Sequence, residues 1–503
     1  MRNLLTKNFR MEYLILLIVG MMMLYTFPSD PDFGWHYKYG EYIVNKRELL
    51  TDNIFSYTYP DYKWSNSYWI SQIIIYSFFK LTGPILLSLI TGFIISLLIA
   101  YMLLKINGAT SLFGKTISSL IIFVALSSFQ VTIRPLFFST IFLFLLLYIL
   151  MKKEKYVILL PLLFPLWVNM HADFTMALMI LGLYFASKSY TELKNKSLKK
   201  LELAKRALIY FSCLAATLLN PNGINLWTTL IKDTAHFKDY IGVSEMLPLN
   251  LSVANTTIIN MIFMSSSLIL ASALLSNKLY KLNNPAREDK KFEYWYIILV
   301  IIFFIWSIRS IYFFRILVIL GIFAVDYLWG NLALLLVHKL NKPLVDTVAK
   351  YIGGMFFPVL LIFSMELFFK SLDTTLSADK FCKKTKYPCG AITYLKQNKL
   401  KGNMFNHYNF GGFLIWQLPD YKTFIDGRMP SWRDKDGYLF KEYNDIISNP
   451  SENYDKFSNL VDKYDVGFVL DYKGSKLYKF LTGEKGWKEI YSDEISAVLA
   501  RDY

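Results

Sequence analysis

The sequence predicts an α-helical polytopic membrane protein with about eleven spans, followed by a soluble α/β domain outside the cytoplasm. Three observations lead to this fold class. The 503 residues are 54% hydrophobic and only 18% charged, whereas soluble domains carry about a quarter charged residues. Apolar runs of spanning length recur up to residue 370 and then stop. The formal net charge of +16 falls mostly between those runs, since residues 371–503 hold 20 Lys and Arg against 18 Asp and Glu. Such a composition excludes a purely soluble enzyme, a disordered chain and a secreted disulfide scaffold.

The expected spans are the apolar runs that approach the length of the hydrocarbon core, which takes about 20 helical residues. The clear candidates are residues 11–27, 84–104, 117–131, 136–151, 257–275, 311–329 and 351–369. Shorter runs complete the set at residues 156–167, 175–186, 207–219 and 294–308. A further apolar stretch, residues 68–81, is short for a crossing. We expect it to be interfacial or re-entrant.

The basic residues of the short loops predict the orientation, because Lys and Arg in such loops stay in the cytoplasm. Basic clusters at residues 2–10, 152–155, 188–206 and 278–291 fall on one side of an eleven-span arrangement. The first long loop, residues 28–67, has six acids against four bases and falls on the other side. We therefore expect a plasma-membrane protein with its amino terminus in the cytoplasm. The transmembrane domain would comprise residues 1–370, and residues 371–503 would form the extracytoplasmic domain.

The first outer loop opens with two carboxylates. A helix that starts near Phe33 places Asp32, His36 and Tyr39 on one face, and Asp30 just before it. Two carboxylates beside an imidazole suit a general base, a divalent-cation site or a group that orients a hydroxyl. The alternative is that Asp32 only caps the helix and the aromatic residues anchor it at the interface. The sequence leaves both interpretations open.

A second polar cluster lies in the hairpin turn at residues 167–173, which contains His171 and Asp173. The two arms of this hairpin are short, so we expect the turn to lie below the membrane surface and face a cavity. An ordinary polar turn is the alternative.

Arginines on the predicted outer side run against the positive-inside bias and need an acidic partner or a phosphate. They are Arg134, which precedes Pro135, and the pair Arg309 and Arg315 around another turn. The sequence is consistent with two roles for these arginines, which are contact with the phosphate of a donor and structural ion pairs with acidic residues. Glu245, in the outer loop at residues 220–256, is either a further functional acid or a solvated loop residue.

Cysteine use is light, with three residues in the chain. Cys213 lies within an expected span, where packing is its ordinary role. Cys382 and Cys389 lie in the extracytoplasmic domain, where oxidation is permitted. A disulfide between them and a pair of free thiols are both open.

Several motifs resemble one bacterial group of polytopic proteins. In the first loop they are residues 30–36 (DPDFGWH), 39–43 (YGEYI) and 51–58 (TDNIFSYT). Further on they are residues 134–135 (RP), 169–173 (NMHAD), 220–223 (NPNG), 402–416 (GNMFNHYNFGGFLIW) and 424–428 (FIDGR). That group resembles the GT-C superfamily of membrane glycosyltransferases, which includes protein O-mannosyltransferase and lipid A aminoarabinose transferase relatives.

The resemblance implies a GT-C-like fold and a polyprenyl-phosphate-linked sugar donor. In those enzymes an acid in the first outer loop is catalytic, and this role would fall on Asp30 or Asp32. Two positions depart from the pattern of the group. Gly34 stands where an aromatic residue usually precedes Trp35, and the hairpin turn reads His171-Ala172-Asp173 where two glycines usually follow the histidine. The second departure alters the pocket shape or adds a carboxylate.

The soluble domain alternates helical and strand patterns, which predicts a small α/β fold with a partly parallel sheet. Expected helices cover residues 391–397, 412–417, 439–447, 454–463 and 476–481. Expected strands cover residues 403–407, 423–426, 466–470, 488–491 and 496–501. The loops at residues 406–409 and 426–428 follow expected strands, at the edge where open α/β sheets bind ligands. Tight turns without a ligand are the alternative.

These observations lead to one main hypothesis, an inverting GT-C-like glycosyltransferase on the outer face of the plasma membrane. It would move a sugar from a polyprenyl-phosphate donor to a glycan, lipid or protein acceptor, and nucleic acid is no expected partner. Asp32 is the favoured base, with Asp30 supporting it or joining it at a divalent cation. Arg134 and Arg309 would hold the donor phosphate, His36, His171 and Asp173 would line the acceptor side, and Glu245 would be a further substrate-binding acid.

The competing hypothesis is a non-enzymatic membrane protein, either a transporter or an assembly factor that displays the soluble domain. Transporters commonly show paired repeats with matching broken helices. The sequence contains no clear internal repeat of this kind.

Overall fold

The computed structural model divides the chain into two compact units. It describes residues 14–106, 122–123, 125–126, 133–235, 243, 246–248, 256–283, 293–339, 342–433, 437–483 and 486–501. The helical unit comprises Met1–Phe27, Pro84–Gly223 and Ser244–Ser371. The mixed unit comprises Pro28–Gly83, Ile224–Val243 and Leu372–Tyr503. The expected extracytoplasmic domain began at Ser371. The mixed unit starts one residue later in that part of the chain, and it also includes the expected outer segments before Gly83 and after Gly223.

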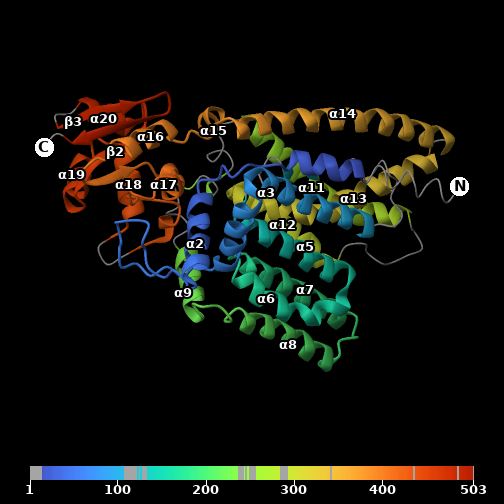
Figure 1. Cartoon of the computed structure of the whole chain (residues 1–503). Coiled ribbons are helices and arrows are strands. Elements are labelled where there is room, and N and C mark those ends of the chain that lie inside the picture. The colour runs from blue at the N-terminus through green and yellow to red at the C-terminus, as the bar shows by residue number, and fades with distance from the viewer. Residues whose placement is uncertain are drawn as a thin grey trace. The chain divides into compact units, whose positions relative to one another are not determined.

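The helical unit is built from mainly apolar helices of different lengths. They are Leu14–Met23, the second part of α3 (Trp69–Ile106), α5 (Leu136–Lys152), α6 (Leu160–Val168), α7 (Phe174–Lys194), α8 (Lys200–Ala216), α11 (Thr256–Asn283), α12 (Tyr294–Arg309), α13 (Phe314–Lys339) and α14 (Lys342–Leu376) (Figure 1). The 3-10 segments η1 (Glu154–Leu159) and η4 (Ile311–Phe313) precede α6 and α13. Helix α13 lies tightly against α11, since a Cβ at Gly321 would meet Ile269 at 2.7 Å.

One helix in the described part of the chain, Trp69–Leu103, is long and apolar enough to cross a membrane. Shorter apolar helices cover Leu14–Met23, Leu136–Lys152, Ile262–Leu275, Tyr294–Arg309 and Ile311–Val325. The expected span at residues 117–131 lies mostly outside the described residues. The count of about eleven spans therefore stays a prediction.

Helix α3 joins two runs that the sequence separates. The stretch expected to be interfacial or re-entrant forms its first part, and the span expected from residue 84 forms its second. Between them Gly83 leaves helical geometry, with φ 72° and ψ 175°. Glycine adopts this conformation at no steric cost, and Pro84 begins the second part as it would the first turn of a new helix.

The mixed unit surrounds a four-stranded sheet. Its strands are β1 (Asn403–Asn406), β2 (Val466–Tyr472), β3 (Trp487–Ser492) and β4 (Ser496–Arg501), in the order β1-β2-β4-β3. Strands β1 and β2 are parallel, and β4 runs antiparallel to both of its neighbours. Strand β2 (VGFVLDY) is a nearly continuous apolar run, which is typical of a strand buried on both faces.

Helices cover both faces of this sheet. The helices of the mixed unit are α2 (Phe33–Lys46), the first part of α3, α9 (Ile224–Ala235), α15 (Ala378–Thr385), α16 (Cys389–Gln397), α17 (Gly411–Gln417), α18 (Leu439–Ser448), α19 (Tyr454–Lys463) and α20 (Lys476–Gly483), with 3-10 turns η5 (Tyr408–Phe410) and η6 (Met429–Ser431). Val469 of β2 belongs to the core with α18, α19 and α20. Its neighbours Phe468 and Leu470 belong to the opposite core, with α16 and α17.

The expectation of a mostly helical chain with a small carboxyl-terminal sheet is confirmed. One expected strand, residues 423–426, is wrong. Only an isolated parallel bridge between Ser56 and Thr423 forms there. The amide of Phe424 donates instead to the Asn406 side chain at 2.7 Å, so the backbone of this segment is not available for a strand ladder.

Candidate functional site

The two carboxylates of the first loop form a compact turn before α2, which we call the acid turn (residues 30–32). The amide of Asp32 donates to Asp30 Oδ1 at 2.9 Å. The indole Nε1 of Trp35 donates to Asp32 Oδ1 at 3.0 Å. Asp32 stands at the N-cap position, but its side chain makes no capping hydrogen bond. The carboxylate is therefore oriented by Trp35 and not used to cap the helix.

Three glycines allow the acid turn to approach the main chain of the carboxyl-terminal part. A Cβ at Gly427 would lie 1.9 Å from Asp32 Oδ1. A Cβ at Gly412 would lie 1.9 Å from the carbonyl oxygen of Pro31, and one at Gly34 would lie 1.9 Å from that of Gly412. No other residue type fits these positions without displacement. Gly34, the departure from the group pattern noted in the sequence, thus permits close packing of α2 on α17.

A buried ion pair follows directly after this contact. Arg428 and Asp426 are paired at 2.7 Å, and both side chains are fully buried. The same guanidinium donates to the Tyr39 hydroxyl at 2.9 Å, so it links the carboxyl-terminal part to α2. Burial alone would lower the pKa of Arg428, but Asp426 and Tyr39 outweigh it and raise that pKa above its ordinary value. Arg428 stays charged inside the unit.

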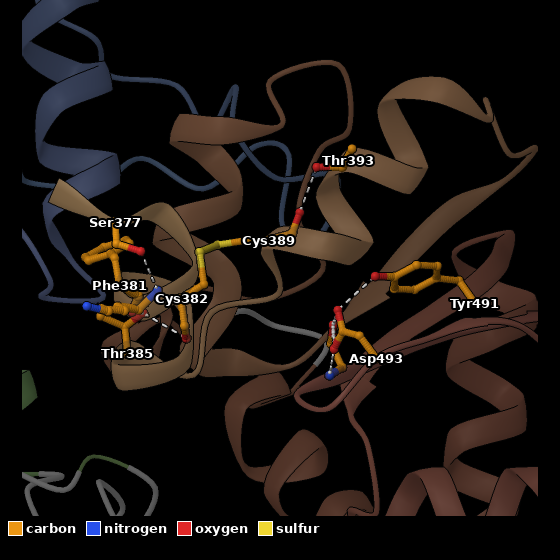
Figure 2. Close-up of a disulfide and its surroundings, with 10 residues drawn as sticks. Ser377, Phe381, Cys382, Thr385, Cys389, Thr393, Tyr491 and Asp493 are labelled. Carbon is orange, nitrogen blue, oxygen red and sulfur yellow. Dashed lines mark hydrogen bonds between the residues drawn. A yellow bond between two sulfur atoms is a disulfide. The ribbon is translucent and has the colours of Figure 1, made fainter. Parts of the chain in front are cut away.

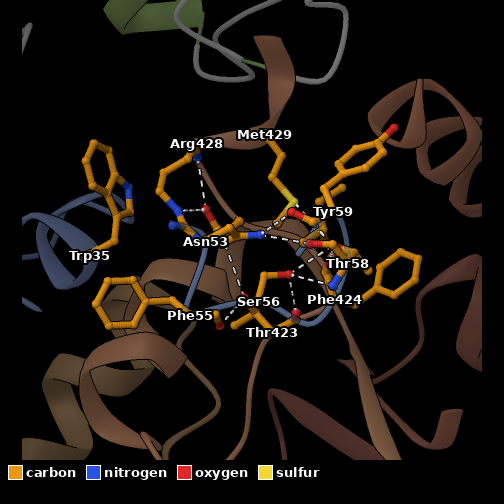
Figure 3. A network of polar contacts seen from close by, with 12 residues as sticks. Trp35, Asn53, Phe55, Ser56, Thr58, Tyr59, Thr423, Phe424, Arg428 and Met429 are labelled. Carbon is orange, nitrogen blue, oxygen red and sulfur yellow. Dashed lines mark hydrogen bonds and ion pairs between the residues drawn. The ribbon is translucent and has the colours of Figure 1, made fainter. Parts of the chain in front are cut away.

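A polar network fixes the first loop to the 423–429 segment (Figure 3). The Ser56 hydroxyl donates to the Thr423 carbonyl at 2.7 Å. The Thr58 hydroxyl donates to the Phe424 carbonyl at 2.7 Å, and Asn53 closes the loop by donating to the Thr58 carbonyl at 2.8 Å. Segments more than 360 residues apart in sequence therefore share one buried set of hydrogen bonds.

Tyr387 holds the acid turn from a third direction. Its hydroxyl donates to the Ser29 carbonyl at 2.8 Å, and its ring stacks on Phe413 of α17 with centroids 4.2 Å apart. Burial, followed by the charges of Asp30 and Asp32, raises the pKa of Tyr387 above its ordinary value. The hydroxyl therefore remains a neutral donor.

Tyr387 lies in a loop closed by a disulfide. The bond joins Cys382 of α15 to Cys389 of α16, with Cα atoms 6.1 Å apart (Figure 2). The third cysteine, Cys213, is buried and free.

His36 faces a different neighbour from Asp32. It is buried, and its Nδ1 lies 3.2 Å from the side-chain nitrogen of Gln72 on α3. The side-chain oxygen of Gln72 accepts in turn from Asn66 at 2.8 Å. His36 thus takes part in the packing of α2 against the first part of α3.

In the helical unit, the predicted hairpin residues belong to a second buried cluster. Arg315 pairs with Asp173 and donates to the Thr140 hydroxyl at 2.8 Å. The Tyr312 hydroxyl donates to the other Asp173 oxygen at 2.5 Å. His171 lies beside the pair, with its Nδ1 3.6 Å from Asp173. The Asp173 carboxylate already accepts from two donors, so its first role is to hold Arg315.

The remaining predicted residues differ in their surroundings. Arg134 lies near enough for its charge to act on His171. Arg309, at the end of α12, is exposed and has no hydrogen bond or ion pair with the described residues. Glu245 lies outside the described residues. The acid turn belongs to the mixed unit, whereas Arg134, His171, Asp173 and Arg309 belong to the helical unit.

A divalent-cation site is one of the roles that the sequence leaves open for the acid turn. Within the described ranges, no three His, Cys, Asp or Glu side chains are grouped closely enough to hold a metal ion. The acid turn supplies two carboxylates, and Mg²⁺ is commonly held by one or two carboxylates together with waters and substrate phosphates. We derive no chemical step through a metal ion.

Sequence reasoning missed several residues that complete these clusters. The sequence predicts a strand-end loop at residues 426–428, but the contact of Gly427 with Asp32 joins positions about 395 residues apart and leaves no local pattern. Tyr387 and Tyr312 carry no motif. The sequence places Arg309 and Arg315 around the same turn. Of these two arginines, Arg315 is the one that pairs with Asp173.

No family model matches the chain, and no curated protein matches it in sequence. A solved structure does match, that of the archaeal oligosaccharyltransferase AglB from Archaeoglobus fulgidus in complex with an inhibitory peptide and a dolichol-phosphate. The TM-score is 0.56 at 12% identity, over 92% of this chain and 69% of that one. The chain shares the fold of that structure, which agrees with the expected GT-C-like fold. At this identity the likeness shows the fold alone, and the narrower relation to the mannosyltransferase and aminoarabinose transferase branches stays a prediction.

Proposed function

We propose that this protein is a membrane glycosyltransferase that moves a sugar from a polyprenyl-phosphate donor to an acceptor on the outer membrane face. The observation that carries the proposal is the Asp32 carboxylate, held by Trp35 at the start of the first-loop helix in a GT-C-type fold. The neighbour AglB is an oligosaccharyltransferase whose structure contains a dolichol-phosphate. A lipid-phosphate donor is the matching substrate class for this chain.

The proposed reaction is an inverting displacement with Asp32 as the general base. The Asp32 carboxylate takes the proton of the acceptor hydroxyl, and the acceptor oxygen attacks the anomeric carbon of the donor sugar. The bond between that carbon and the phosphate oxygen breaks, and the polyprenyl phosphate leaves with the electron pair. Asp30, through its hydrogen bond with the Asp32 amide, keeps the turn in shape.

We assign the remaining predicted residues narrower roles. Arg134 and Arg309 are the proposed contacts of the donor phosphate, because a planar guanidinium suits phosphate oxygens. His171 is a proposed acceptor-side residue, and Asp173 is proposed to keep Arg315 in place beside it. The buried position of His36 favours a packing role over acceptor contact.

The test is sugar transfer by the purified protein in proteoliposomes. Labelled polyprenyl-phosphate sugars serve as donors, and envelope extract serves as the source of acceptors. We expect Asp32→Asn to lower kcat by about 10²–10⁴-fold, the usual contribution of a general base. Asp61→Asn is the matched control, because Asp61 is an exposed acid of the same loop.

Equal activity of Asp32→Asn and wild type would remove Asp32 from the mechanism. A transporter would move the labelled lipid across the bilayer without releasing free polyprenyl phosphate. Absence of that product with every donor would therefore contradict the transferase proposal.

A further inference from the structure

We infer that the carboxyl-terminal domain positions the catalytic carboxylate, and that Gly427 is the residue through which it does so. This inference rests on the proposed function. The proposed role is positioning and not catalysis, since Gly427 has no side chain to react. It gives the soluble domain a function in the chemical step, independent of any acceptor that it binds.

The acid turn is held from three sides by residues after Leu372. Tyr387 bonds to the carbonyl of the residue before the turn, at 2.8 Å. The main chain of Gly412 contacts Pro31, and that of Gly427 contacts the Asp32 carboxylate. The three contacts come from the α15–α16 loop, the start of α17 and the 423–429 segment. Each belongs to a buried part of the same unit.

The Gly427 contact differs from the others because it acts on a side chain. A Cβ at Gly427 would lie 1.9 Å from Asp32 Oδ1 and 3.3 Å from Trp35 Nε1. A methyl group there would thus intrude on the hydrogen bond that orients the carboxylate. At Gly412 and Gly34 the atoms met are carbonyl oxygens, so alanine would have to separate the two main chains.

The main chain at Gly427 is held in place, so the carboxylate has to give way. The Arg428 amide donates to Asp426 Oδ1 at 3.1 Å. The Arg428 guanidinium donates two further hydrogen bonds to the same carboxylate. The Tyr39 hydroxyl accepts from the third nitrogen of that guanidinium at 2.9 Å. Shifting Gly427 would disturb a fully buried ion pair, which is more costly than rotating one aspartate.

The test compares Gly427→Ala with wild type in the full-length protein. We expect at least a tenfold lower kcat for sugar transfer, with KM and the melting temperature nearly unchanged. Gly483→Ala is the matched control, because a Cβ there would meet nothing within 4 Å.

A second readout follows Asp32 without any substrate. Carbodiimide labelling of Asp32 in the intact protein, quantified by peptide mass spectrometry against pH, gives the midpoint of its titration. Because a hydrogen bond to the carboxylate favours the ionised form, its loss should move this midpoint to higher pH in Gly427→Ala. Trp35→Phe should give the same direction, and the double variant should add little to either single one.

Wild-type kcat and an unmoved midpoint in Gly427→Ala would overturn the inference. If Gly427→Ala does not fold, Trp35→Phe serves as the test instead. An unmoved Asp32 midpoint in Trp35→Phe would likewise overturn the inference. The proposed function and this inference fail separately. A wild-type protein without transfer activity refutes the first, whereas the labelling midpoints still test whether Gly427 orients Asp32.

Discussion

At the scale of single residues, the pair of Asp426 and Arg428 is the main charged feature inside the mixed unit. A buried ion pair is stabilising only when its hydrogen bonds are satisfied, because desolvating both charges is costly. Here the Asp426 carboxylate accepts from three groups of Arg428 and from the Thr423 hydroxyl at 3.2 Å.

Removing one partner of this pair should be severely destabilising. Arg428→Ala leaves a buried carboxylate without its counter-charge, and we expect a loss of about 3–5 kcal/mol in the free energy of unfolding. Chemical denaturation of the purified protein measures it. Arg501→Ala breaks the exposed pair with Asp462 and should cost less than about 1 kcal/mol. Similar losses in both variants would contradict the assigned role of the buried pair.

Asp233 of α9 should make stability depend on pH. Burial raises the pKa of Asp233 to about 6, and the charge of Arg433 opposes this only in part. The folded protein then holds a proton that the unfolded chain has lost, so this contribution to stability is complete below about pH 4 and disappears as the pH rises through about 6.

Asp233→Asn should remove that dependence, because the amide stays neutral. We expect the variant to melt at a higher temperature than wild type at pH 7 and at a similar temperature at pH 4. Thermal scans across this range measure the difference. An equal gap at both pH values would show that Asp233 does not titrate in this window.

At the scale of elements, the sequence predicts the carboxyl-terminal helices and strands closely. Helix α19 and strand β4 have the predicted bounds, since an amphipathic period and an apolar strand pattern are local signals. The break at Gly83 falls between residues 68–81 and 84–104, which the sequence predicts as separate apolar stretches. Residues 423–426 are apolar enough for a strand, but the Asn406 side chain binds their backbone groups, since it accepts from the Phe424 amide at 2.7 Å and donates to the Ile425 carbonyl at 2.8 Å.

The disulfide between α15 and α16 should stabilise the region around Tyr387. It closes a short loop, with a sequence separation of 7, and the chain-entropy model gives about 2–3 kcal/mol for such a loop. The double variant Cys382→Ser/Cys389→Ser should therefore melt at a lower temperature than wild type. Dithiothreitol should lower the wild-type melting temperature and leave the variant unchanged. Insensitivity of wild type to the reductant would mean that the bond does not stabilise the fold.

At the scale of the whole molecule, the fold class was predictable and the partnerships within each unit were not. The acid turn and the hairpin turn were recognised from their residue types. Their partners, Gly427 for Asp32 and Arg315 for Asp173, lie far along the chain and are specified by tertiary packing alone. The inclusion of residues 28–83 in the same unit as residues 372–503 has the same cause. The hydrophobic periodicity of one segment does not indicate which distant segment will pack against it.

Orientation in the membrane is the prediction on which the proposed reaction depends. Two independent features agree on it. The basic clusters predict a cytoplasmic amino terminus and an outer carboxyl-terminal domain, and a disulfide in that domain suits an oxidising compartment.

Alkaline phosphatase fused after Tyr503 should be active, and green fluorescent protein fused there should be dark. At Lys196, in the basic turn between α7 and α8, the two reporters should behave in the opposite way. Bright green fluorescence at the carboxyl end would place the carboxyl-terminal domain in the cytoplasm. Because Asp32 belongs to the same compact unit as that domain, Asp32 would then lie on the cytoplasmic side as well, which would contradict transfer at the outer face.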